Sequence, residues 1–386
     1  MLKMSKRIVV ITSGRFPEGE PGSIRINMIC KSLVEEGYEI IVLCRGNANE
    51  KKIVSNGISY YSLRSIDNGK FKKIYDYCRF SNKVKKTIIS LGKIECLYIY
   101  NAPISIFKWS KKYSIQNDIK LVHDCVEWYS SEEFRFGKLN PIYRFKNYIN
   151  TKVIDKNFKI IAISNYLKQY FMSKGIESIR IPMLCDISEF NMVKKVKDDK
   201  LHLFYAGTPA KKDLIGNVIK ALTLLPKDKQ KRVEFMIIGC NEDYLVKNCE
   251  INYEIINEVR HILQFSERIP REEVIKRMSI ADFIVIPRDA SLRYAKAGFP
   301  SKVVEGLANS TPILCNYSSD LNKYLEDGKN AIVAVDHSPK ELAVAIERAL
   351  DITPKMKLYM QEEALKTAVK YFDFRCYSKK LGLFLK

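Results

Sequence analysis

Glu305 and Lys302 lie one helical turn apart in a segment whose pattern favours a phosphorylated sugar as ligand. The segment, residues 297–312, reads AGFPSKVVEGLANSTP, a tight loop that leads directly into a helix. A helix start offers N–H groups and a positive dipole end to an anion, and a glutamate one turn in can accept hydrogen bonds from hydroxyls. A carboxylate on a mostly apolar helix would otherwise be partly buried without a partner. We expect phosphate and ribose here.

Length and composition indicate an enzyme-sized protein of two domains. The chain has 386 residues, more than one hydrophobic core usually supports, and its hydrophobic fraction of 46% is typical of a globular protein. Its ten cysteines never form a Cys-x-x-Cys pair, so we interpret them as small buried hydrophobes. No run approaches the roughly 20 apolar residues of a membrane span, and no signal peptide is recognised at residues 1–12. We expect a cytoplasmic protein.

The net charge of +21 is concentrated in the first half of the chain. Residues 1–186 carry 32 Lys and Arg against 17 Asp and Glu, a net of +15, whereas residues 187–386 carry 33 against 27, a net of +6. This asymmetry favours an anionic partner, either a lipid surface or nucleic acid. No RNA- or DNA-reading motif is recognised, which favours the lipid.

Buried strands and amphipathic helices alternate along the whole chain, a pattern typical of parallel sheets with helices on both faces. Two series of strands are predicted. The first comprises residues 7–12, 39–44, 58–63, 95–100, 120–126 and 158–163, and the second comprises residues 202–207, 233–238, 262–265, 282–287, 312–315 and 331–335. We predict two Rossmann-like, doubly wound α/β domains that face each other across a cleft, where ligands of such sheets bind.

The predicted domain boundaries follow the polar stretch between the two series. Residues 1–186 form an N-terminal acceptor-binding domain, residues 187–200 a linker, and residues 201–370 a C-terminal nucleotide-sugar-binding domain. Residues 371–386 are expected to pack back toward the N-terminal domain.

Several loop-centred motifs occur in one order. The second series contains YAGTPAKKD at 205–213, FMIIG at 235–239, LQFSERIPREE at 263–273, ADFIVIPR at 281–288 and the segment at 297–312; the first contains PGSIR at 21–25, VHD at 122–124 and IAISN at 161–165. In this order they resemble the bacterial family 4 glycosyltransferases of the GT-B fold, particularly those of surface-polysaccharide assembly with Gly-Phe-Pro-Ser/Thr-Lys at the donor loop. The resemblance covers nearly the whole chain.

The resemblance implies transfer of a sugar from a nucleoside-diphosphate sugar to a glycan or polyprenyl-linked acceptor, with no other cofactor. It implies the following site residues. Catalytic candidates are His123, Asp124 and Lys212; donor-binding candidates are Gly22, Ser23, Arg25, Lys211, Arg268, Arg288, Gly298, Phe299, Ser301, Lys302, Val304 and Glu305; acceptor-binding candidates are Glu127 and Trp128.

The same resemblance implies retention of anomeric configuration. Lysines, arginines and helix dipoles can stabilise the departing diphosphate, and no Asp-x-Asp pair follows a strand, so we expect no metal ion. Asp124 and Glu127 are the nearest candidates for a carboxylate nucleophile. We favour attack of the acceptor from the leaving-group face, with the diphosphate as base.

Two positions depart from the family pattern. The family usually has an arginine where Thr208 stands, and a first donor-loop glutamate where Ala297 stands. Ala297 is compatible with an unusual donor sugar, with compensation by Lys296 or Arg293, or with loss of activity. The alternatives to a transferase are therefore a nucleotide-sugar epimerase of the same architecture and a catalytically degenerate binding module.

Two basic segments indicate a peripheral attachment to the inner face of the cell membrane. Residues 70–93 hold eight Lys and Arg with a single acid, and residues 141–155, with Asn140 as cap and Pro141 in the first turn, are predicted to form an amphipathic helix. Its expected apolar side comprises Ile142, Phe145, Ile149 and Val153. The alternative is that both helices pack on the sheet with a solvated basic face.

Overall fold

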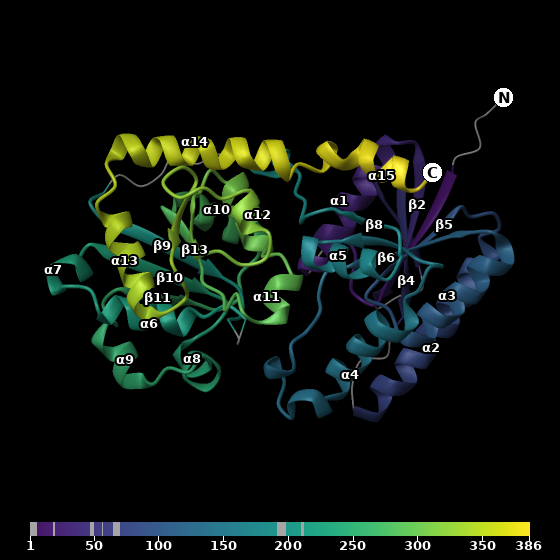
Figure 1. Cartoon of the computed structure of the whole chain (residues 1–386), viewed down its shortest axis with the longest axis horizontal. Helices are drawn as coiled ribbons and strands as arrows, with labels where there is room; N and C mark the ends of the chain where they lie inside the picture. Colours follow the sequence, from purple (N-terminus) through teal and green to yellow (C-terminus); the bar gives the residue numbers. More distant parts are fainter. Residues whose placement is uncertain are drawn as a thin grey trace. The chain divides into compact units, whose positions relative to one another are not determined.

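A computed structural model describes residues 6–17, 20–46, 50–55, 57–64, 70–190, 198–209 and 212–386 of the chain (Figure 1). The fold consists of two compact units, and the described parts of residues 1–185 and 374–386 form the first. Residues 186–373 form the second, of which 191–197, in the expected linker, lie outside the described residues.

The first unit is built on an eight-stranded sheet in the order β3-β4-β2-β1-β5-β6-β7-β8. All neighbouring strands pair in parallel except β3 with β4. The strands are β1 (Lys6–Thr12), β2 (Tyr38–Gly46), β3 (Glu50–Ser55), β4 (Ile58–Arg64), β5 (Cys96–Tyr100), β6 (Lys120–Cys125), β7 (Lys159–Ala162) and β8 (Ser178–Arg180).

Helices cover both faces of this sheet because their apolar sides need burial. The helices are α1 (Pro21–Glu35), α2 (Lys70–Ser90), α3 (Ile104–Asn117), α4 (Pro141–Tyr148), α5 (Asn165–Ser173) and α15 (Ser378–Phe384). The C-terminal helix α15 packs against α1, and the hydroxyl of Ser32 in α1 donates to the carbonyl of Phe374 at 2.9 Å. The last residues of the chain therefore complete the core of the first unit.

The second unit contains a six-stranded, wholly parallel sheet in the order β11-β10-β9-β12-β13-β14. The strands are β9 (Leu201–Ala206), β10 (Val233–Ile238), β11 (Leu263–Ser266), β12 (Phe283–Ile286), β13 (Ile313–Asn316) and β14 (Ala331–Ala334). The prediction of two doubly wound α/β sheets is confirmed; β3 and β8 are the strands that the apolar runs did not predict.

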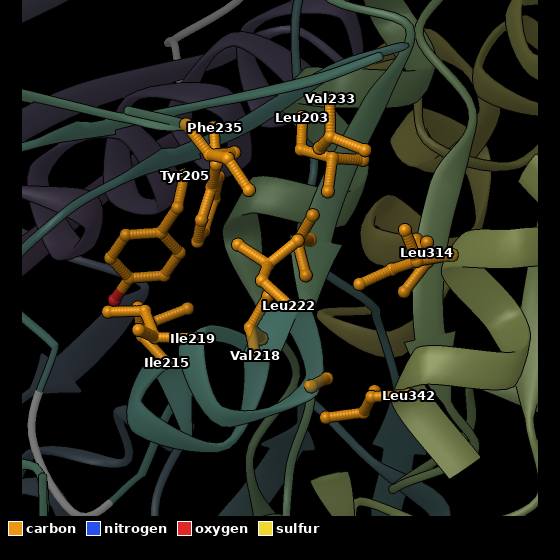
Figure 2. Close-up of a cluster of buried hydrophobic side chains, with 14 of the residues drawn as sticks. Leu203, Tyr205, Ile215, Val218, Ile219, Leu222, Val233, Phe235, Leu314 and Leu342 are labelled. Atoms are coloured by element: carbon orange, nitrogen blue, oxygen red, sulfur yellow. The ribbon is translucent and has the colours of Figure 1, made fainter. Parts of the chain in front are cut away.

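Two layers of helices enclose the second sheet. The helices are α6 (Ile215–Thr223), α7 (Lys227–Gln230), α8 (Glu242–Asn248), α9 (Tyr253–Glu258), α10 (Arg271–Ile280), α11 (Arg293–Ala297), α12 (Ser301–Ala308), α13 (Pro339–Leu350) and α14 (Pro354–Tyr371). In one layer α12 contacts α10 and α14, and in the other α6 contacts α9 and α13. Figure 2 shows the Tyr205 ring beside Ile215 and Ile219 of α6, with its hydroxyl at the edge of the core cluster.

Each sheet has one point where the strand order reverses direction, and ligands of such sheets bind at the carboxyl ends of the strands there. In the first unit this switch point lies between β1 and β5, and in the second between β9 and β12. Residues that follow these four strands are thus the first candidates for a site.

No helix among the described residues is long and apolar enough to span a membrane. Of the cysteines whose side chains are described, most are buried, Cys249 is half-buried and Cys376 is exposed. Burial raises the pKa of the Cys44, Cys96 and Cys315 thiols to about 12, consistent with small hydrophobes in the core.

Candidate active site

A cluster of charged side chains lies at the switch point of the second sheet. Asp213, in the turn before α6, accepts hydrogen bonds from the Lys302 ammonium at 2.8 Å and from the Tyr205 hydroxyl at 2.9 Å. Its other oxygen accepts from Arg288 Nε at 2.9 Å and pairs with Arg288 Nη2 at 2.8 Å. The cluster therefore joins the ends of β9 and β12 to the start of α12.

Charge pairing stabilises the ionised form of Asp213. Burial alone would raise the pKa of this carboxyl, but the charges of Lys302 and Arg288 more than offset it, so its pKa lies well below the ordinary value. Two cations and one carboxylate leave a net positive charge beside the positive end of α12. The side chains of Lys302 and Arg288 retain 19% and 11% exposure, so an anion can reach both.

Gly207 allows Lys302 to lie against the end of β9. Its φ of +145° lies in a region that favours glycine, and a Cβ here would come within 2.8 Å of Lys302 Cε. A larger residue would displace the lysine from the cluster. The backbone of the strand end thus lies directly beside the cation.

Glu305 lies on α12 one turn after Lys302, as the sequence predicts. Its side chain is 22% exposed, and its Oε1 lies 3.9 Å from Nε of Arg271 at the start of α10. Arg271 also pairs with Glu189 at 3.3 Å. Burial raises the pKa of Glu305, although the charges of Arg271 and Lys302 oppose this shift. Among the described residues, the Glu305 carboxylate thus has one long ion pair, and part of its surface is exposed to a ligand.

The other donor candidates flank this cluster. Arg268 donates to the hydroxyl of Thr208 at 3.1 Å, so a guanidinium lies beside the position where the family usually has an arginine. The carbonyl of Lys212 accepts from the Tyr294 hydroxyl at 3.2 Å, and its ammonium lies 5.9 Å from that ring's centroid. Gly298 follows α11, Ser301 begins α12, and Lys211 lies outside the described residues.

A cavity of about 310 Å³ opens at the switch point of the first sheet. It is lined by residues that follow β1, β5 and β6 and by the first turn of α1. The lining includes Thr12, Gly14, Arg15, Glu20, Gly22, Ser23, Tyr100, Asn101, His123, Asp124, Glu127, Lys146 and Asn150. Charged groups of both signs thus line a space large enough for a sugar.

Five candidates from the sequence line this cavity: Gly22, Ser23, His123, Asp124 and Glu127. His123 packs edge-on against Phe107 and bonds through Nδ1 to the Ile99 carbonyl at 3.1 Å. Burial lowers the pKa of His123 to about 4, so its ring is neutral near pH 7. Glu127, Gly22 and Ser23 also contribute to the wall, and the Ser23 hydroxyl donates to the Arg15 carbonyl at 2.8 Å.

Arg25 and Asp124 form a buried ion pair inside the first unit. The Arg25 guanidinium donates to both oxygens of Asp124 at 2.8 and 2.9 Å and to the carbonyls of Ile181 and Pro182. The Tyr98 hydroxyl donates to Asp124 at 2.7 Å. Both oxygens of Asp124 are therefore hydrogen-bonded within the protein, which disfavours a role as nucleophile. The Arg25 guanidinium is held in the same way, which favours a structural role over contact with the donor substrate.

The side chains of Trp128, Phe299 and Val304 pack in the interior. Trp128 donates through its indole N–H to the Asn147 side chain, packs on Tyr170 and is not part of the cavity wall. Phe299 lies in an aromatic cluster, and Val304 is 1% exposed. Ala297, where the family has a glutamate, is fully buried at the end of α11.

Sequence reasoning missed Asp213, Tyr205 and Lys146. Asp213 reads as an ordinary residue before a helix, and its partners Lys302 and Arg288 lie 89 and 75 residues away. Lys146 reads as part of a basic helix, yet it lines the cavity and donates to the Asn101 side chain at 2.6 Å. The position of Asp213, a charged residue in the turn between a strand and a helix, could have indicated a site residue.

Among the described residues, no group of three or more His, Cys, Asp and Glu side chains is arranged to hold a metal ion.

Comparison with known proteins relates the second unit to a known family. Residues 187–367 match the family described as Glycosyl transferases group 1. A curated relative, an uncharacterised glycosyltransferase of the archaeon Methanocaldococcus jannaschii, is 21% identical over 227 residues. The match covers 56% of this chain, and the chain spans about half of that relative's length, 55%.

Three solved structures share the fold over nearly their whole length. Sucrose-phosphate synthase from Thermosynechococcus elongatus matches with a TM-score of 0.75 and 13% identity, over 98% of each chain. HepE of Anabaena, in complex with UDP and glucose, matches with a TM-score of 0.70 and 14% identity, over 98% of this chain and 99% of HepE. WaaG, a glycosyltransferase involved in lipopolysaccharide biosynthesis, matches with a TM-score of 0.68 and 13% identity, over 98% of this chain and 99% of WaaG. At these identities the likeness shows the fold alone. The chain therefore has the GT-B fold, and residues 187–367 resemble the group 1 glycosyltransferases.

Proposed function

We propose that this protein transfers a sugar from a nucleoside-diphosphate sugar to a glycan or polyprenyl-linked acceptor in surface-polysaccharide synthesis. The observation that carries the proposal is the pair of cations, Lys302 and Arg288, fixed on Asp213 at the switch point of the second sheet. Fixed positive charge at a helix start is suited to a diphosphate. The complex of HepE with UDP and glucose supports this donor class.

In this proposal the nucleotide lies along the start of α12. The diphosphate binds Lys302 and Arg288, with Lys212 and Arg268 at its edge, and Glu305 accepts hydrogen bonds from the ribose. Lys302 and Glu305 are three residues apart on one helix, so their side chains share a face. Phosphate and ribose are adjacent in a nucleotide, which this spacing matches.

The acceptor binds in the cavity of the first unit. The neutral His123 ring can form a hydrogen bond with a hydroxyl of the acceptor substrate. The Glu127 carboxylate can accept a hydrogen bond from another sugar hydroxyl, and the Lys146 ammonium can donate one. A cavity of about 310 Å³ suits a sugar-sized ligand and not a nucleic-acid strand.

The proposed reaction retains anomeric configuration and uses no metal ion. Negative charge grows on the departing diphosphate, and Lys302, Arg288 and the α12 dipole stabilise it. Because Arg25 and Tyr98 occupy both oxygens of Asp124, we favour attack of the acceptor hydroxyl from the leaving-group face. The diphosphate oxygen then takes the hydroxyl proton, and the sugar–phosphate bond breaks as the new glycosidic bond forms.

We further propose that the enzyme works on an anionic membrane surface, the inner face of the cell membrane. The supporting feature is the 134–154 segment, which holds five Lys and Arg and no acid. Five large apolar side chains in it are 42–74% exposed: Phe136, Leu139, Ile142, Phe145 and Tyr148. Exposed apolar groups ringed by basic ones fit the boundary between headgroups and acyl chains.

This surface differs in part from the predicted amphipathic helix. Asn140 caps α4, as expected, by accepting from the N–H groups of Ile142 and Tyr143. A π-helical turn, Ile149–Val153, follows α4 and buries Ile149 and Val153 in the first unit. Ile142 and Phe145 are exposed, whereas Ile149 and Val153, in the π-helical turn, face the core.

The test is to incubate the protein with a panel of nucleotide sugars, with and without a polyprenyl-diphosphate-linked acceptor, and to identify the products. We expect nucleoside diphosphate and a lengthened acceptor in equal amounts, only when both substrates are present. Conversion of the donor without acceptor would instead indicate an epimerase. Binding of donor without any product under all conditions would indicate a degenerate binding module.

A further inference from the structure

Asp213 is the common partner of the groups that surround the proposed phosphate position. It is 5% exposed, and its two oxygens accept from Lys302, Tyr205 and Arg288 at 2.8 to 2.9 Å. All four residues belong to the second unit. The carboxylate thus lies beneath two cations that keep more exposure than it does.

We propose that Asp213 is a positioning residue, which holds the Lys302 ammonium and the Arg288 guanidinium in the geometry that receives the donor diphosphate. The inference rests on the proposed function, because it concerns the same donor site. Asp213 itself does not touch the ligand: it acts through the two cations.

The geometry favours positioning over simple charge balance. One Asp213 oxygen takes both Nε and Nη2 of Arg288, while the other takes Lys302 and Tyr205, so each cation has its own fixed acceptor. The Lys302 ammonium also lies 4.8 Å from the Tyr205 ring centroid. A lysine has a flexible four-carbon stem, and fixing it before the ligand arrives removes an ordering cost from binding.

The two possible roles of Asp213, charge neutralisation and positioning, predict opposite changes in nucleoside-diphosphate affinity when the carboxylate is removed. If Asp213 only neutralised the cations, Asp213→Asn would make the site more positive, and a nucleoside diphosphate would bind more tightly. If Asp213 positions them, the same change would release Lys302 and Arg288 to repel each other, and binding would weaken. The sign of the change therefore decides between them.

The experiment is calorimetric titration of UDP into the whole protein and its variants. We expect Asp213→Asn to weaken UDP binding by tenfold or more. Tyr205→Phe keeps the ring and the carboxylate but removes one hydrogen bond, so we expect a smaller loss of two- to fivefold. This second variant keeps the test decisive if Asp213→Asn does not fold.

Asp282→Asn is the matched control. Asp282 is also a buried carboxylate of the second unit, paired with Lys357 at 2.9 Å and bonded to the His202 N–H at 2.9 Å. We expect its substitution to lower the melting temperature and to leave UDP affinity unchanged. An equal loss of affinity in both variants would overturn the inference, because a general loss of structure would explain it.

A double-mutant cycle separates an effect through Lys302 from an independent one. We expect Lys302→Met to weaken UDP binding and Asp213→Asn to add little to that loss, because both remove the same held cation. Fully additive losses would overturn the inference, as would unchanged or tighter UDP binding by Asp213→Asn. A wild type that binds UDP but transfers no sugar would overturn the proposed function alone.

Discussion

The Lys302 ammonium lies 2.8 Å from the carboxylate of Asp213, across 89 residues of sequence. This contact joins the start of α12 to the turn after β9 and fixes a cation at the switch point of the second sheet. The contact affects stability as well as binding. Protonation of a buried carboxylate removes its ion pairs, and the stabilisation that they contribute is lost.

We expect the Asp213 cluster to make stability depend on acid pH. Its folded-state pKa is depressed, so the ionised form stabilises the fold above the unfolded-state pKa of about 4, and this contribution is lost as pH falls below that value. Between pH 6 and pH 3 the wild type should lose about 1 kcal/mol more unfolding free energy than Asp213→Asn. Urea unfolding at each pH measures this. Parallel pH profiles for the two proteins would contradict the assignment.

The buried Arg25–Asp124 pair should be important for folding of the first unit. Among the described residues, Arg25→Met leaves Tyr98 as the remaining donor to the Asp124 oxygens, so we expect a loss of about 3–5 kcal/mol in unfolding free energy. Adding Asp124→Leu should recover much of it, since no buried charge is left unpaired. Urea unfolding checks both variants. A single variant within 1 kcal/mol of wild type would show that the pair is not needed.

The 134–154 segment should bind anionic vesicles. We expect sedimentation with phosphatidylglycerol and not with phosphatidylcholine, and release at high salt, where the screening length falls from ~8 to ~3 Å. Leu139→Ser with Phe145→Ser should weaken binding about tenfold or more, because each buried apolar side chain contributes about 1.5–3 kcal/mol.

Leu358→Ser with Val335→Ser is the control for that experiment. Both residues are exposed apolar side chains of the second unit, so the change in surface polarity is similar. The control should bind vesicles as the wild type does. If both double variants bind equally, or if the wild type binds both lipids equally or neither, the segment is not a docking surface for anionic membranes.

Sugar transfer should continue in excess chelator. Lys302, Arg288 and the start of α12 supply the positive charge that the departing diphosphate needs, so EDTA should change the rate by less than about twofold. The measurement is nucleoside-diphosphate release with and without EDTA. Activity lost in EDTA and regained with magnesium or manganese would show that a metal ion takes part.

The sequence was sufficient to predict the two sheets and the start of α12. Apolar strands that alternate with helices are compatible with few other folds, and the loops that follow the strands mark the switch points. The assignment of Glu305 and Lys302 to one face of a helix needed only local spacing.

Side-chain partners across the sheet could not be predicted in the same way. Whether Arg25 meets a ligand or Asp124 depends on the packing of α1 against β6, which no local pattern encodes. The same holds for Asp213, whose partners come from β9, α12 and the residues after β12. The predicted apolar face also divides: Ile142 and Phe145 are exposed, whereas Ile149 and Val153, in a π-helical turn, are buried, so a single period of 3.6 residues does not describe the whole segment.

The most direct test of the account is calorimetric titration of the nucleoside diphosphates of the five common bases into wild type, Glu305→Ala and Lys302→Met. We expect at least one to bind the wild type and each substitution to weaken it about ten- to a hundredfold, the equivalent of about 1.5–3 kcal/mol for a charge-assisted hydrogen bond. If none binds, or if both variants bind as the wild type does, the start of α12 is not the donor site.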